Sequence, residues 1–247
     1  MPQLPIDLLT KVTEYVPMRR DRLRMLYVSK RFGFIESLLN EKKPYIYTGP
    51  IGYSEYVNRR NKGDVIYKRV VYTFDDRMTY GNEIPEGVTD VDKRCFAHEN
   101  SIISLIIPEG VKRLDHACFK GCLALTSIQL PSTLTYIGSN CFECCRSLKQ
   151  FTFPPFVSEV APGCLWKCDK LTSLSIPNTV ERIGECAFQY CSSLISLTLP
   201  NRLEYIGDGA FWLCGSLRQM TFPPLLKHVG NGAFWCCTNM FQINTMK

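Results

Sequence analysis

The chain has 247 residues, of which 45% are hydrophobic, and 29 Lys and Arg against 23 Asp and Glu give it a formal net charge of +6. No apolar run reaches the roughly 20 residues of a membrane-spanning helix, and the mixing of both charges argues against a nucleic-acid partner. Residues Met1 to Asp7 lack a basic start followed by an apolar stretch, so we expect no secretory signal peptide.

Residues 1–45 carry apolar side chains at helical spacing on both sides of Pro17, which predicts short amphipathic helices. The phrase LPIDLL at Leu4–Leu9 and the phrase VSKRF at Val28–Phe32 together resemble the two ends of an F-box. The resemblance implies docking to the Skp adaptor of an SCF-type ubiquitin ligase. The docking residues it implies are Leu4, Pro5, Leu8, Leu9, Val12 and Val16. The middle of the segment is short and rich in arginine, so a helical cap for the following domain is the alternative.

Residues 46–87 are predicted to be a linker followed by a degenerate capping repeat. The phrase IPEG at Ile84–Gly87 recurs at Ile107–Gly110, one repeat length later. We therefore expect residues 65–87 to be an incomplete first repeat.

From Val88 onward, a 23-residue pattern occurs seven times without insertion or deletion. Counting Val88 as position 1 of the first repeat, positions 1 and 4 are aliphatic and position 9 is a large apolar residue such as Phe96. A fixed period in the twenties is typical of a solenoid. One unit cannot bury its apolar face alone, so the units must stack.

Each repeat contains two short segments that are predicted to be strands. Apolar and polar residues alternate from Gln150 to Phe153, as in a strand with one buried face, and Pro154 ends that strand because it lacks an N–H group. Stacked copies would form a parallel sheet. The second predicted strand opens the repeat and ends in a turn at position 5. Four glycines share that position, which predicts a positive φ there: Gly138, Gly184, Gly207 and Gly230.

The phrase LISLTLPNRLEYIGDGAFWLC at Leu194–Cys214 resembles the BspA-like class of leucine-rich repeats, and the resemblance covers residues 88–247. It implies a curved, right-handed solenoid with a parallel β-sheet on its concave face, and binding in place of catalysis. With the helical N-terminal segment, the predicted fold class is α+β.

The thirteen cysteines follow the repeat, because position 8 holds Cys or Ala and position 12 holds Cys in six repeats. A position that exchanges Cys with Ala requires a small buried residue, so we expect free thiols and no zinc site, with disulfides between turns as the alternative. Many unpaired thiols suit a reducing compartment, which favours the cytoplasm, with the nucleus as a second location and the cell surface disfavoured.

Two surfaces are candidates for partner binding. Nearly uncharged polar residues alternate with the buried residues of the concave strands, and they could hydrogen-bond a peptide or only keep the sheet solvated: Ser127, Gln129, Gln150, Thr152, Ser173, Ser175, Ser196, Thr198, Gln219 and Thr221. The three tryptophans all occupy position 10, where they could form an aromatic interface or fill gaps between turns: Trp166, Trp212 and Trp235.

No catalytic, cofactor-binding or metal-binding pattern occurs in the chain, so the sequence predicts a protein-interaction protein and no enzyme. The leading hypothesis is an F-box-type substrate receptor that binds a protein target through the repeats, and the alternative is a BspA-like cell-surface adhesin or host-matrix binder. The last repeat lacks a polar capping unit, so we also expect a homodimer through its strand, Met240–Asn244.

Overall fold

The computed structural model describes residues 45–60, 65–240 and 242–245. The predicted helical F-box-like segment lies outside these residues. The chain divides into two compact units, Met1–Val70 and Val71–Lys247, and each is described by itself.

The described part of the first unit contains strand β1 (Tyr45–Gly52), helix α4 (Tyr53–Arg59) and most of strand β2 (Val65–Tyr72). Tyrosine rings hold these elements together. The ring of Tyr67 on β2 meets the rings of Tyr47 and Tyr56 edge to face, at 5.7 and 5.8 Å between centroids. Edge-to-face contact is the favoured geometry for aromatic pairs.

The second unit begins with the last two residues of β2, Val71 and Tyr72, which pair in parallel with strand β3 (Asp90–Val91). Helix α5 (Phe74–Tyr80) follows, and its N-terminus is closed by a capping box between Thr73 and Asp76. This arrangement satisfies N–H groups that a helix start leaves unpaired.

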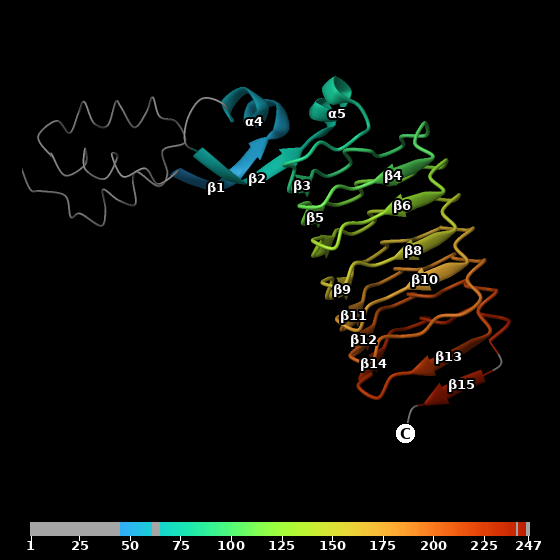
Figure 1. Cartoon of the computed structure of the whole chain (residues 1–247). Helices are drawn as coiled ribbons and strands as arrows, with labels where there is room; N and C mark the ends of the chain where they lie inside the picture. Colours follow the sequence, from blue (N-terminus) through green and yellow to red (C-terminus); the bar gives the residue numbers. More distant parts are fainter. Residues whose placement is uncertain (1–44, 61–64, 241, 246–247) are drawn as a thin grey trace, which may run out of the picture. The chain divides into compact units, whose positions relative to one another are not determined.

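The rest of the second unit is a stack of 23-residue turns, with one row of strands along each of two sides (Figure 1). The strands that open the turns are β3, β5 (Arg113–Leu114), β7 (Tyr136–Ile137), β9 (Glu159–Val160), β11 (Arg182–Ile183), β12 (Tyr205–Ile206) and β14 (His228–Val229). The strands that close them are β4 (Ser104–Ile106), β6 (Ser127–Gln129), β8 (Gln150–Thr152), β10 (Ser173–Ser175), β13 (Gln219–Phe222) and β15 (Gln242–Thr245).

The strand pairing confirms the predicted solenoid, because partners such as Ser173 and Gln150 are one repeat apart and run parallel. The α part of the predicted α+β class is small here: the described residues hold two seven-residue helices, α4 and α5.

The core is a column of side chains from position 9. The rings of Phe96, Phe119 and Phe142 are fully buried and stack at 5.0 and 5.3 Å between successive centroids. Phe188 and Phe211 continue the column at 5.2 Å after the turn that carries Leu165. Equal spacing along the stack lets each turn bury the apolar face of its neighbour, as the repeat pattern predicts.

Glycine at position 5 has a different role from the one predicted. Gly138, Gly184, Gly207 and Gly230 do not have positive φ angles, so that prediction is wrong. A Cβ atom on any of them would lie 2.4–2.7 Å from a backbone nitrogen of the preceding turn. These glycines therefore allow two backbones to approach closely.

Positive φ angles occur instead at positions 7 and 11 of all seven turns, and most of the residues there are not glycine. Leu213 and Cys236 are examples, with φ of 63° and 59°. The stacking of the turns holds these residues in a conformation that side chains ordinarily disfavour.

The cysteines form two buried ladders. At position 12, six thiols each donate to the carbonyl oxygen of position 9 in the preceding turn, at 3.1–3.3 Å. Position 8 holds cysteine in the first four turns, up to Cys164, and alanine in the last three, from Ala187 onward. All thirteen cysteines are free, and Cys236 is the exposed one.

Candidate functional site: the concave strands

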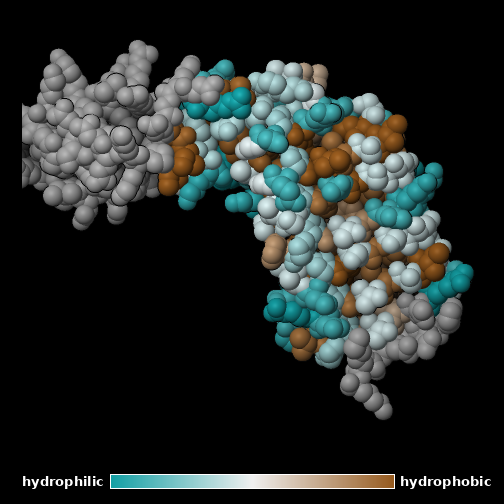
Figure 2. Space-filling view, viewed as in Figure 1, coloured by the Kyte–Doolittle hydropathy of each residue, from teal (hydrophilic) through white to brown (hydrophobic). Residues whose placement is uncertain are grey.

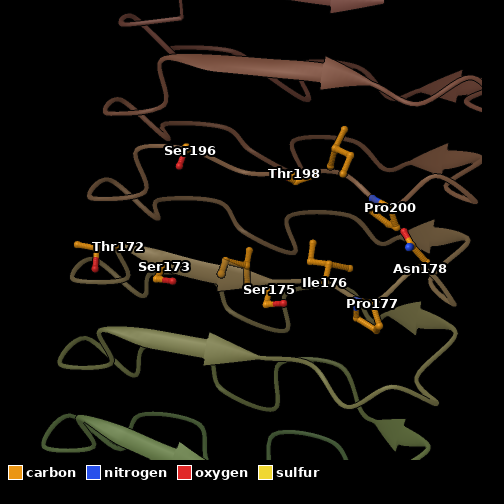
Figure 3. A pocket seen from close by; sticks show the side chains of 11 residues that line it. Thr172, Ser173, Ser175, Ile176, Pro177, Asn178, Ser196, Thr198 and Pro200 are labelled. Carbon is orange, nitrogen blue, oxygen red and sulfur yellow. The ribbon is translucent and has the colours of Figure 1, made fainter. Parts of the chain in front are cut away.

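We call the row of closing strands, β4 to β15, the concave row, because the family resemblance places these strands on the concave face. This row is not one continuous sheet. Strand β4 pairs with β6, β8 with β10 and β13 with β15, which gives three separate two-stranded sheets. Within the described chain, no strand pairing joins β6 to β8. In the turn between β10 and β13 the equivalent segment contains only an isolated bridge at Ser196 (Figure 3). The predicted parallel sheet is therefore interrupted twice.

A hollow of about 460 Å³ lies at the second interruption. Ser173 and Ser175 line it from β10, and Ser196 and Thr198 line it from the next turn (Figure 3). The side chains of Leu174 and Ile176 form its apolar part and are half-buried.

A second hollow of about 500 Å³ lies at the interruption between β6 and β8. Ser127 and Gln129 line it from β6, and Gln150 and Thr152 line it from β8. Ile128, on β6, faces it and is half-buried, whereas the equivalent Phe151 on β8 is 2% exposed.

The hollow beside β10 exposes mainly polar groups and little apolar surface, whereas the hollow between β6 and β8 exposes both kinds about equally. Figure 2 shows hydrophobic residues exposed between pale polar ones over the turns that carry these strands. This combination is typical of binding sites, where apolar contact gives affinity and a few polar groups fix orientation.

Backbone groups add to the hollow beside β10. Ser173 donates its N–H to Lys149, and Ser175 accepts from the N–H of Phe153, so both residues bond toward β8. In an extended strand the peptide groups of the intervening Leu174 point the other way, toward the hollow. Because no ladder forms there among the described residues, these groups can hydrogen-bond a ligand.

One charged side chain is among the described residues that line the two hollows, that of Glu109. The backbone N–H of Ser132 donates to its carboxylate, and the Ser132 hydroxyl also donates. These hydrogen bonds lower the pKa of Glu109, with the backbone bond as the larger cause. Glu109 therefore stays ionised at the rim near neutral pH.

Of the ten polar residues predicted on this face, the eight from Ser127 to Thr198 line the two hollows. Thr221 is half-buried on β13, and the side chain of Gln219 is not described. Sequence reasoning missed the apolar part of each hollow, because Ile128 and Leu174 fit the buried strand pattern as well as their fully buried equivalents do.

The three tryptophans are in two different environments. Trp212 and Trp235 stack on each other at 5.3 Å between centroids, and Trp235 is 64% exposed. Trp166 is half-buried beneath the ammonium group of Lys167, 4.9 Å from the ring centroid, and its buried indole N–H has no hydrogen-bond partner among the described residues.

The predicted adaptor-docking residues, Leu4 to Val16, lie outside the described residues. Across the described ranges, no group of three or more His, Cys, Asp and Glu side chains is placed to hold a metal ion. The same ranges contain no helix of the length and hydrophobicity that a bilayer crossing requires.

Comparison with known families gives one match, to the BspA type leucine rich repeat region, over residues 72–192 and 158–247. No curated protein matches the chain.

Solved structures with the same repeat are similar to this chain. The leucine-rich repeat protein of T. pallidum is 26% identical, with a TM-score of 0.59 over 70% of this chain and 78% of the other. A leucine-rich repeat protein from Bacteroides ovatus is 22% identical, with a TM-score of 0.42 over 73% of this chain and 61% of the other. A leucine rich cell surface protein from Faecalibacterium prausnitzii is 17% identical, with a TM-score of 0.32 over 81% and 83%.

These findings correct one prediction. The cytoplasmic location inferred from the unpaired cysteines is wrong, because the BspA-type match points to the cell surface. Buried thiols do not need a reducing compartment when packing keeps them apart from oxidants. The F-box, the Skp adaptor and the homodimer gain no support from these comparisons.

The family match spans all seven turns and both hollows. Its repeats are in general non-enzymatic scaffolds that bind proteins. This chain belongs to the BspA-type leucine-rich repeat family.

Proposed function

We propose that this protein is a surface binding protein of the adhesin type, and that it takes a protein partner on its concave strands. The observation that carries the proposal is the pair of hollows at the two interruptions of the concave row. The family match favours this function over the F-box hypothesis.

The chemistry of the hollows suits a neutral stretch of polypeptide. Hydroxyl and amide side chains such as Ser175, Thr198 and Gln150 both donate and accept hydrogen bonds, as a peptide backbone does. The half-buried Leu174 and Ile128 offer apolar contact to a small aliphatic side chain of the partner. Glu109 is the one charged residue among the described residues that line the hollows. The choice of protein partner would therefore depend on shape and hydrogen bonding and only weakly on charge.

A substitution at the hollow beside β10 tests the proposal. The full chain would be presented to a panel of purified extracellular-matrix proteins, and binding would be measured by surface plasmon resonance. In the variant Ser175→Arg with Thr198→Arg, two long cations fill the hollow, so we expect affinity for the recognised protein to fall roughly tenfold or more.

The matched control adds the same charge elsewhere, through Ser158→Arg with Ser192→Arg, since both serines are exposed away from the hollows. This control should bind as the wild type does. Equal loss in both double variants, or binding to none of the matrix proteins, would contradict the proposed function. Accessibility of the protein to an antibody on intact cells checks its location separately.

A further inference from the structure

A third hollow, of about 340 Å³, lies on a different surface from the concave strands. We name it the tryptophan groove. One wall is the stacked pair Trp212 and Trp235, and the other is formed by residues of position 6, among them Glu185 and Asp208. Its floor includes the glycines at position 7, Gly209 and Gly232.

Glycine at position 7 accompanies tryptophan at position 10. Three turns have both, in the pairs Gly163–Trp166, Gly209–Trp212 and Gly232–Trp235, and the other four turns have neither. All seven turns nonetheless share a positive φ at position 7. The backbone conformation therefore does not explain where the glycines occur.

Packing does not explain the two glycines of the groove either. A Cβ atom on Gly209 would approach no atom closer than 3.5 Å, and one on Gly232 no atom closer than 3.8 Å, which are ordinary contacts. At Gly163, in contrast, a Cβ atom would lie 2.4 Å from Asn140 Oδ1. At Gly209 and Gly232 the missing side chain leaves space beside the indoles.

The groove carries negative charge. Glu185 and Asp208 are both exposed, and neither forms an ion pair with any residue in the described chain. The backbone N–H of Asn231 donates to Asp208 Oδ1 at 2.8 Å, which fixes that carboxylate at the rim. None of the described residues that line the groove is a lysine or arginine, although the whole chain has a net charge of +6.

The turn with Trp166 shows what a tryptophan at this position can hold. The ammonium group of Lys167 lies 4.9 Å from the ring centroid of Trp166 and 5.7 Å from that of Tyr190. The residues that correspond to Lys167 in the two groove turns are Leu213 and Cys236, which have no charge. Among the described residues, a cation thus lies over Trp166 and none lies over Trp212 or Trp235.

We propose that the tryptophan groove binds an arginine side chain of a protein partner, with the guanidinium group between the indoles and the two carboxylates. Aromatic rings attract cations through their π faces, and a planar guanidinium also stacks on them. The carboxylates of Glu185 and Asp208 supply the complementary charge, and the glycine floor leaves room for the apolar stem. The site does not depend on the concave hollows, so either proposal can fail alone.

The test uses the full chain and two labelled peptides, one with two arginines separated by glycine and one with citrulline in their place. Citrulline keeps the shape of arginine and removes its charge. Binding is followed by fluorescence anisotropy at low salt, where charge contacts are least screened. We expect the arginine peptide to bind roughly tenfold more tightly than its twin, the size of a good cation–π contact.

Two variants should each remove that preference: Trp235→Ala, and Glu185→Gln with Asp208→Asn. All three residues are exposed, so these variants should fold, and in the second variant the new amide oxygen can still accept from the backbone N–H of Asn231. The control Glu159→Gln, an exposed acid outside the groove, and the concave variant Ser175→Arg with Thr198→Arg should keep the preference. Equal affinity for both peptides, or an arginine preference that survives in both groove variants, would overturn the proposal.

Discussion

The thiol of Cys191 donates a hydrogen bond to the carbonyl oxygen of Leu165, at 3.3 Å, across 26 residues of sequence. The same contact recurs at the five other cysteines of position 12. It links each turn to the one before it inside the core, where the carbonyl also accepts a backbone N–H of its own turn, as Leu165 does from Cys168 at 3.3 Å. The thiol therefore has a hydrogen-bonding role at position 12. Position 8 accepts either Cys or Ala and has no such requirement.

We therefore expect Cys191→Ala to destabilise the protein by about 1 kcal/mol more than Cys164→Ala does. Both thiols are buried, and both changes leave a small cavity, but only the first removes one of the two hydrogen bonds that the buried carbonyl of Leu165 accepts. Guanidinium unfolding of the two variants provides the comparison. Equal free energies of unfolding would show that the thiol bond contributes nothing net.

The two leucines in the closing segment of the fourth repeat, Leu171 and Leu174, should respond differently to truncation. Leu171 is fully buried, so Leu171→Ala should cost about 2–5 kcal/mol. Leu174 looks like a core position from the sequence but is half-buried at the hollow, so Leu174→Ala should cost about 1–2 kcal/mol. Thermal or chemical unfolding separates the two, and a larger loss at Leu174 would mean that the hollow is closed in solution.

Two glycine exchanges test the backbone assignments. Cys236 is exposed and has a φ of 59°, so Cys236→Gly should raise the free energy of unfolding by about 0.5–1 kcal/mol. Gly207→Ala should lower it, because the new Cβ would lie 2.6 Å from the backbone nitrogen of Glu185. The opposite order in a denaturant titration would show that position 5 tolerates a side chain and that the positive φ at position 11 costs nothing.

Alkaline pH should destabilise the fold through the buried thiols. Burial raises the pKa of Cys191 and of Cys95 to about 12, from the 9.0 of an exposed thiol. The folded state therefore keeps protons that the unfolded chain releases, so this contribution to stability is complete below pH 9 and declines as pH rises toward 12.

Unfolding measured from pH 8 to 11 should show the decline, and it should be smaller in Cys191→Ser, whose hydroxyl does not titrate in this range. Lysine and tyrosine also titrate there, so the comparison with this variant is the decisive one. Identical pH dependence in the two proteins would exclude Cys191 as a source of the effect.

The sequence alone determined the architecture, because a 23-residue period with no insertion leaves each turn one way to bury its apolar positions. It also determined the buried column at Phe96, Phe119 and Phe142 and the small-residue role of position 8, since both follow from counting. The sequence was misleading on the cellular location of the protein. Cysteines that pack as small apolar residues do not indicate whether the surrounding compartment is reducing.

Only the tertiary structure decided where the repeat departs from regularity. Leu174 and Phe151 occupy the same position of the pattern, yet one borders a hollow and the other is buried, because in the described chain β10 has no ladder to the following turn whereas β8 pairs with β10 on that side. The same holds for glycine, whose role at Gly207 is set by a backbone 2.6 Å away in the preceding turn. Strand pairing and close approach between turns depend on distances across the stack, and a sequence pattern carries only the spacing along the chain.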